Sequence, residues 1–354
     1  MKKIYYITAV FATLFLVGCG DGIDLPGVNV ETDLNKIPLP DNNVNLEQVE
    51  LKPSTEPMLH EGLHTEEDFQ RIRDKKAAGE EPWVSAYQLL VESQFSQKTA
   101  DTYPTEWIKR GVSGDENYMN AARGATIVYQ QALRWKIEQD DEYAAKAVEN
   151  LNKWVQTCVG VTGNTNLSLA AGLYGYEFAI AGELLRDYGG WDRADFAAFQ
   201  NWLLKVFYPA NDDFLKRHHD TNALHYWANW CLCNIAAKMA IGIVTDRRDI
   251  YNEGIAHLQT GDTNGRLRRA IYHDYAPDYN FAQWQESGRD QGHTLMCVGL
   301  MGVICQLAWS QGDDFFAYDD NLFMRACEYA ACCNYTNETV PYTTYIWQKQ
   351  SQWG

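Results

Sequence analysis

Two consecutive stretches decide the fold class: YMNAARGATIVYQQALRWKIEQ, residues 118–139, and EYAAKAVENLNKWVQTCV, residues 142–159. Both repeat apolar side chains at or near positions i, i+3, i+4 and i+7, which is the period of an α-helix that turns one face to a protein core. The first stretch is the more apolar of the two. We therefore predict a hairpin in which the first helix is covered on nearly all sides and the second on one side.

The helical period continues from His64 to near the end of the chain. Further helices are predicted at residues 167–188, 193–207, 221–244, 246–260, 291–312 and 321–333. Glycines and prolines such as Gly160 and Pro209 separate these segments. No stretch alternates Val, Ile and Thr as a strand would. The alternation of apolar and amphipathic helices predicts an all-α fold, an (α/α) toroid built as an incomplete barrel of helical hairpins.

The first residues are typical of an export signal. Lys2 and Lys3 precede an apolar run, residues 7–17, that is too short to cross a bilayer as a permanent helix. Small residues then lead into Cys19, as in a bacterial lipoprotein signal whose cysteine is acylated; a simple secretory signal is the alternative. We expect a signal peptide at residues 1–18, a flexible tether at 19–57 and the toroid at 58–354. This predicts an outer-membrane lipoprotein, facing the periplasm or the cell surface and held in the membrane by lipid on Cys19.

The chain is acidic, with a net charge of −17 and a pI near 4.9. Nucleic acid is therefore excluded as a partner, because phosphate binding requires a basic face. An anionic ligand is not excluded, because Arg and His side chains can reverse the sign of the charge inside a cleft. The cysteines after Cys19 lie in apolar helical stretches without CxxC spacing, which favours buried thiols over a metal site. We expect a monomer.

The segment HHDTNALHYWANW, residues 218–230, carries the first candidate site residues. In the predicted helix, Asn222, His225 and Asn229 fall at positions i, i+3 and i+7 and share one face. Polar groups on an otherwise apolar helix need partners, which a ligand can supply. The alternative is a buried hydrogen-bonded row that only orients the helices.

The segment WQESGRDQGHT, residues 284–294, carries the second group. If the helix already runs here, Arg289 and His293 are at positions i and i+4, and Glu286 lies three residues before Arg289. These charges stand at the entrance to the apolar run 295–309. Several polar groups at the entrance to a core helix favour a functional site over an ordinary surface.

A third group lies at the start of the first apolar helix. Asn120 and Arg123 are at positions i and i+3, just after Tyr118. Arg is suited to gripping a carboxylate through two parallel hydrogen bonds, although a neighbouring acid is an equally good partner. Tyr174 has the same two interpretations, stacking on a sugar ring or packing in the core.

Three motifs resemble the alginate lyase superfamily of glycan-degrading bacteria: HEGLHTEED at 60–68, HYWANW at 225–230 and QESGRDQGH at 285–293. The resemblance implies an (α/α) toroid that cleaves uronic-acid polymers without a metal or other cofactor. In the best-known branch an Asn-His pair and an Arg neutralise the uronate, and a Tyr or His moves the protons. Here Asn222 and His225 are three residues apart, and Tyr226, Tyr275 and Tyr279 are all candidates for the Tyr. Relatives continue well past a segment like residues 340–345, so we expect a ring that lacks its last hairpins.

These features together predict a polysaccharide lyase. It would cleave alginate or a glucuronan-like polymer by β-elimination and leave a 4,5-unsaturated uronate. The expected catalytic residues are Asn222, His225, Tyr226, Arg289 and His293. The expected substrate-binding residues are Tyr118, Asn120, Arg123, Tyr174, Asn229, Trp284, Gln285, Glu286 and Gln291.

Three alternatives stay open at the level of the sequence. A glycoside hydrolase on the same toroid would need two opposed carboxylates, for which Glu286, Asp290 and Asp220 are available. A glycan-binding lipoprotein would need the aromatic residues but not the Arg, His and Asn groups. An inactive, shortened lyase is the third.

Overall fold

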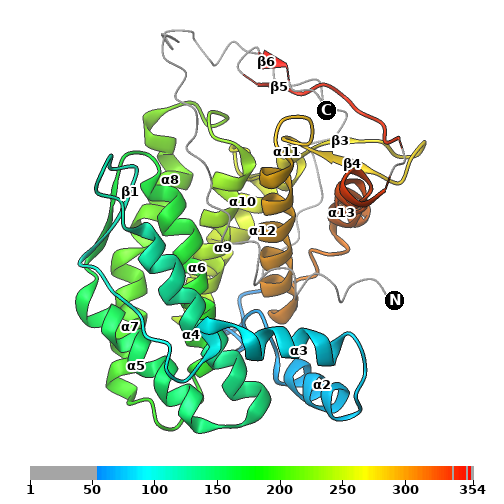
Figure 1. Ribbon diagram of the computed structural model, residues 1–354. Helices are drawn as coiled ribbons and strands as arrows, with labels where there is room; N and C mark the ends of the chain where they lie inside the picture. Colours follow the sequence, from blue (N-terminus) through cyan, green and yellow to red (C-terminus); the bar gives the residue numbers. More distant parts are fainter. Residues whose placement is uncertain (1–53, 337–338, 348–349, 352–354) are drawn as a thin grey trace.

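The computed structural model describes residues 54–336, 339–347 and 350–351. Four long helices pack side by side in the order α4, α6, α9, α12 and run in the same direction (Figure 1). Their bounds are Tyr118–Glu138, Leu167–Leu185, Ala228–Val244 and Gln291–Ser310. We call the end formed by their N-termini the mouth and the end formed by their C-termini the floor.

Each inner helix is followed by an outer one that returns toward the mouth. The outer helices are α5 (Asp141–Thr157), α7 (Arg193–Val206) with α8 (Tyr208–Arg217), α10 (Arg248–Thr260) and α13 (Tyr318–Tyr335). Among the described residues, the extensive packing does not continue from α12 back to α4, so the ring is open there. The predicted all-α, incomplete (α/α) toroid is confirmed.

The two roles of the helices follow from their sequences. In α9 every residue except Trp230 is buried, because the helix is mostly apolar and its polar residues Asn229, Asn234 and Lys238 have partners. The outer helix α5 buries one face only, with Ala144, Leu151 and Trp154 fully covered. Five of the eight cysteines in the described part of the chain are buried, namely Cys158, Cys231, Cys233, Cys297 and Cys305. An inner helix covered on nearly all sides and an outer helix covered on one side are the packing predicted from the sequence.

The sequence of α12 fits both a membrane-spanning helix and a buried core helix. Within the described residues it is the one helix long and apolar enough, by length and composition, to cross a membrane. In the structure 56% of its most apolar window is buried inside the toroid. It packs between α9 and α13, as a core helix does.

Three short sheets were not predicted. β1 (Trp107–Arg110) pairs in parallel with β2 (Gly160–Gly163), and β3 (Ile271–Asp274) pairs antiparallel with β4 (Ala282–Trp284). The third joins β5 (Ile346–Trp347) to β6 (Gln350–Ser351). Strands of two to four residues are too short for an alternating pattern to be visible. The first two sheets, with the short helix α11 (Leu267–Ala270), lie at the mouth and tie together the loops that precede α4, α6 and α12.

The chain enters the toroid across its floor. Helices α2 (Glu66–Ala77) and α3 (Trp83–Glu92), followed by the 3-10 turn η3 (Gln94–Ser96), form a hairpin beside α4. Thr65 caps α2: its hydroxyl accepts from the Asp68 N–H while the Asp68 carboxylate accepts from the Thr65 N–H. The residues before it, 54–64, are the strap, which crosses the C-terminal ends of three inner helices.

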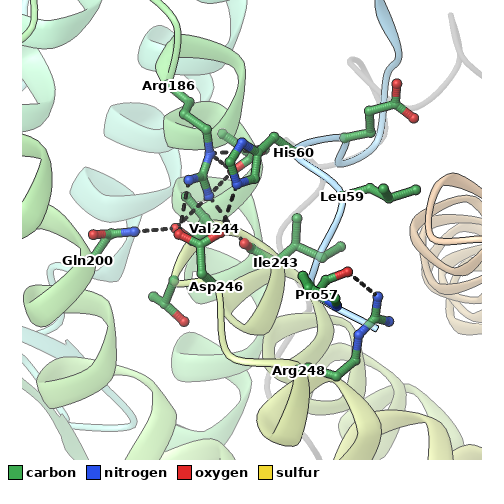
Figure 2. A network of polar contacts seen from close by, with 12 residues as sticks. Pro57, Leu59, His60, Arg186, Gln200, Ile243, Val244, Asp246 and Arg248 are labelled. Carbon is green, nitrogen blue, oxygen red and sulfur yellow. Dashed lines mark hydrogen bonds and ion pairs between the residues drawn. The ribbon is translucent and has the colours of Figure 1, made fainter. Parts of the chain in front are cut away.

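The strap is held by side chains from separate helix ends (Figure 2). Arg248 donates to the carbonyl oxygens of Glu56 and Pro57 at 2.8 and 3.0 Å. Gln311, which ends α12, donates to the carbonyl of Leu59 at 3.0 Å. His60 Nε2 lies 3.0 Å from a carboxylate oxygen of Asp246, which also pairs with Arg186 at the end of α6.

These contacts bear on the expected tether. Residues 54–57, which the sequence placed in it, are docked on α10. The expected signal peptide, Cys19 and the remainder of the tether lie outside the described residues.

Glycine allows close approach between helices at two places. A Cβ on Gly172 of α6 would lie 2.4 Å from the Sγ atom of Cys233 on α9, and one on Gly242 would lie 2.6 Å from the backbone nitrogen of Tyr251 on α10. Backbone cannot move aside as a side chain can, so Gly242→Ala should lower the free energy of unfolding by about 1–3 kcal/mol. Gly189→Ala is the matched control, because its Cβ would meet nothing within 4 Å. Equal urea midpoints for the two variants would contradict this packing argument.

A buried acid in α6 makes stability depend on pH. Glu177 Oε2 is buried without a hydrogen-bond partner among the described residues. Burial raises the pKa of Glu177 to about 8. Between its unfolded value of 4.5 and about 8, the folded protein holds a proton that the unfolded chain releases, so stability falls as pH rises through this window. Glu177→Gln should raise the free energy of unfolding at pH 8 by about 1–3 kcal/mol and change it little near pH 4.5. Denaturation curves of both proteins across this range test it; parallel pH profiles would refute it.

Candidate active site

The turn before α9 differs from the sequence prediction. α9 begins at Ala228, so Asn222 and His225 lie in a turn and do not share a helix face with Asn229. The reason is local: the Asn222 side chain accepts a hydrogen bond from the Leu224 N–H at 2.8 Å, and its carbonyl accepts from the His225 N–H at 2.9 Å. Asn side chains that capture nearby backbone in this way compete with helix formation.

Glu286 joins residues from two inner helices at the mouth. Its side chain is 1% exposed. One carboxylate oxygen accepts from the amide of Asn229 at 3.2 Å, and the other contacts the Arg289 guanidinium and lies 3.0 Å from Nδ1 of His293. A buried carboxylate needs such partners, and these partners are fixed by it in turn. The residues that the sequence singled out here therefore do lie together. Glu286 and Asn229 were expected to contact the substrate, but both are buried and hold neighbouring side chains in place instead.

Arg289 is the cation that this arrangement presents at the mouth. It precedes α12, which begins at Gln291, and its side chain is 36% exposed. Its guanidinium lies over the ring of Trp227 at 4.9 Å, a cation–π contact that holds its plane. The buried carboxylate of Glu286 contacts the guanidinium of Arg289, so the exposed part of this cation is held in a fixed position.

His293 is oriented by two carboxylates. Its Nδ1 lies 3.0 Å from Glu286 and 3.1 Å from Asp290, which also caps α12 by accepting from the His293 N–H. Two carboxylate oxygens beside Nδ1 favour a proton on that nitrogen, and the Arg289 Nη1 atom also lies 3.3 Å from it. His293 is 24% exposed, so it can act at the mouth.

Three further residues predicted to bind substrate have structural contacts. Trp284 is 1% exposed and donates to the carbonyl of Ala326 in α13. Gln285 is 3% exposed and accepts from the Ala228 N–H at 3.2 Å, which caps the first turn of α9. Trp284 and Gln285 are thus corrected to supporting roles. Gln291 is partly exposed and bonds Ser287 and Asn334.

His225 and Tyr226 form a second part of the site beside α9. Their rings meet edge to face at 4.8 Å, and Tyr226 also packs on Trp230 at 4.7 Å. Burial lowers the pKa of His225 and raises the pKa of Tyr226. Near neutral pH a neutral imidazole, able to accept a proton, therefore lies beside a protonated phenol, able to donate one.

The chain matches the family model described as alginate lyase over residues 72–338. The chain belongs to the alginate lyase family. It is therefore a polysaccharide lyase that acts on an acidic polysaccharide. No curated protein sequence matches this lyase.

Solved structures share the fold of this lyase. A variant of alginate lyase A1-III complexed with a tetrasaccharide has a TM-score of 0.60 at 14% identity, over 79% of this chain and 82% of that chain. An alginate lyase from Bacteroides ovatus has a TM-score of 0.53 at 14% identity, over 76% and 82%. Alginate lyase A1-III from Sphingomonas species A1 has 0.53 at 13% identity, over 78% and 80%. At this identity the likeness establishes the toroid alone.

The remaining predicted residues of the lyase lie along α4 and α6. Tyr118 stacks on Tyr174 at 6.5 Å, beneath the guanidinium of Arg110, and Tyr174 is only 5% exposed. Asn120 and the exposed Arg123 line a hollow of about 310 Å³ between α4 and the loop that follows η3. Among the contacts described for the chain, none joins these four residues to Glu286 or Arg289, and their predicted role in substrate binding stays a prediction.

Two features of the lyase were not found from the sequence. Trp227, which supports Arg289, lies in the HYWANW motif but was not predicted to have a role. His218 and His219 begin the segment 218–230, and their adjacency was a usable signal. His218 is 2% exposed against Cys231, whereas His219 is partly exposed beside Tyr226.

Proposed function

We propose that this lyase cleaves a uronic-acid polymer, alginate or a glucuronan-like chain, by β-elimination with Arg289 as the group that neutralises the uronate. The single observation that carries the proposal is the placement of Arg289, which Glu286 and Trp227 hold at the mouth with part of its guanidinium exposed. Such a fixed cation suits a carboxylate, to which Arg can bond through two parallel N–H groups.

The chemistry explains why this cation matters. The proton on C5 of a uronate is a very weak acid while the adjacent carboxylate is charged, because removing it would place two negative charges together. Arg289 stabilises the enolate-like state that forms. A base then takes the C5 proton, its electron pair forms the C4–C5 double bond, the C4–O4 bond breaks, and an acid protonates O4.

His225 and Tyr226 are the pair we assign to these proton transfers. Their burial favours the neutral imidazole and the protonated phenol, which are the states a base and an acid require. We assign the holding of the uronate to Asn222, in the turn just before this pair, and to His293, beside Arg289 at the mouth.

A glycoside hydrolase would lack one of the carboxylates that the sequence offered for it. Glu286 is sealed and ion-paired, so it cannot face a glycosidic bond as a general acid. Incubation with alginate, with a glucuronan and with a neutral glucan tests the proposal. Ultraviolet absorbance of an unsaturated product is expected with an acidic polymer and not with the glucan. New reducing ends without absorbance would indicate hydrolysis, and binding without either would indicate a glycan-binding protein; both results exclude the proposed reaction.

We also propose that the protein is exported and anchored by lipid on Cys19. The basic residues Lys2 and Lys3, the apolar run 7–17 and the small residues before Cys19 support this. In a producing cell fed labelled palmitate, the wild-type protein should carry label in the outer-membrane fraction and Cys19→Ala should not. Equal labelling of both would exclude this anchor.

A further inference from the structure

Residues 218–220 have an unusual backbone between α8 and α9. They form the 3-10 turn η4 (His218–Asp220), and the φ angles of His218, His219 and Asp220 are 47°, 53° and 58°. Residues with a Cβ rarely adopt this left-handed region, and three in a row are rarer still. Glycine or asparagine would fit the turn with less strain. A His at position 219 therefore has another reason to be there, and such strain often accompanies a functional role.

The ring of His219 has polar partners in α6 and in the loop before it. Nε2 lies 2.9 Å from the hydroxyl of Ser168, in the first turn of α6. The ring also bonds to the backbone of Thr165, in the loop between β2 and α6. Its face packs against Tyr226, with ring centroids 5.8 Å apart in an edge arrangement. His219 thus links the turn before α9 to the loop before α6.

Thr165 connects this link to the proposed acid. Its side chain hydrogen-bonds to Tyr226, whose side chain is only 8% exposed. The Tyr226 ring is fixed on its other sides by Phe214 and Trp230. The orientation of the phenol hydroxyl therefore depends on where Thr165 lies, and that depends on His219.

We propose that His219 is a positioning residue, which holds the Thr165 loop so that the Tyr226 hydroxyl points to the leaving oxygen of the bound uronate. This inference rests on the proposed function, in which Tyr226 is the acid. We assign His219 no proton transfer with the substrate, because its Nε2 is engaged with the Ser168 hydroxyl.

The test compares His219→Ala with the conservative variant His219→Gln, whose amide can still bond to Ser168. Misplacement of a reacting group by about 1 Å costs roughly 10²-fold. His219→Ala should therefore lower kcat by about 10–100-fold with KM changed less than about 3-fold, and His219→Gln should recover most of it. His257→Ala is the matched control: this part-buried His in α10 contacts the Thr263 hydroxyl at 2.7 Å and should leave kcat unchanged.

Two measurements separate the possible failures. A positioning role lowers kcat by the same factor at every pH, whereas loss of the acidic limb of the pH profile in His219→Gln would show that His219 transfers protons and would overturn the proposal. The second readout, the NMR signal of a ¹³C-labelled Tyr226 ring, does not need activity. The chemical shift of this signal should change in His219→Ala and stay the same in His257→Ala. An unchanged chemical shift in both variants would also overturn the proposal. If the wild-type protein forms no unsaturated product, the proposed function is wrong. The NMR comparison would then still decide the role of His219.

Discussion

Replacing Arg289 with alanine should lower kcat/KM for a uronate polymer by about 10³-fold, which corresponds to about 4 kcal/mol of transition-state stabilisation. The guanidinium is held against Glu286 and over Trp227, so it is already in place when negative charge develops beside the uronate. Pre-organised groups of this kind account for most of the stabilisation of developing charge in enzymes. Arg289→Lys should recover only part of the loss, because an ammonium cannot make two parallel hydrogen bonds to a carboxylate.

The substrate provides the sharpest control for Arg289. A methyl-esterified polymer carries no charge on the uronate, so the deficit of Arg289→Ala should shrink on it. Arg71→Ala, which removes a surface Arg of α2, should leave both substrates unaffected. The product is followed by its ultraviolet absorbance. An equal deficit on charged and esterified polymer would show that Arg289 does something other than neutralise the carboxylate.

Replacing Glu286 with alanine should give the second large effect, on activity and stability together. The carboxylate is the shared partner of Asn229, Arg289 and His293, and removing it leaves a buried amide unpaired and the side chains of Arg289 and His293 unanchored. We expect kcat/KM to fall by about 10²–10³-fold, since Arg289 loses its fixed position. The free energy of unfolding should fall by about 2–3 kcal/mol, less than the roughly 3–5 kcal/mol of a fully buried pair because Arg289 is 36% exposed.

A second buried ion pair separates these two effects of Glu286. Glu183, whose side chain is 4% exposed, pairs with Arg186 at the floor. Glu183→Ala should lose at least as much stability in urea denaturation, because both members of its pair are buried, but retain its kcat, whereas Glu286→Ala should lose both. Full activity of folded Glu286→Ala would remove its assigned role in holding Arg289.

The helices and their order were predictable because the helical repeat of apolar side chains is visible within a short stretch of sequence. The first hairpin was expected at 118–139 and 142–159, and the structure has helices at Tyr118–Glu138 and Asp141–Thr157. The start of α9 was placed seven residues early. Apolar residues before Ala228 continue the helical period, but the Asn222 side chain bonds to local backbone, and this competition between neighbours is not visible in a periodicity count.

The candidate site was predictable in its residue types and much less in its geometry. Arg289 and His293 meet as their spacing suggested. Glu286 was also singled out, but its contact with Asn229 joins positions 57 apart in the chain, and only the packing of α9 against α12 creates it. The same holds for Tyr226, whose bond to Thr165 depends on how α6 and α9 pack. Spacing within one helix therefore located the reactive groups, while their burial was set by helices far away in sequence.

The strap determines where the described chain enters the toroid. It enters at the floor, and the 17 residues of α9 separate that end from Arg289 and Tyr226 by roughly 25 Å. Residue 54, at which the described chain begins, therefore lies at the end of the toroid opposite the reactive groups. An attachment on that side does not cover the mouth, so a long polysaccharide can reach Arg289 and Tyr226 from the open side.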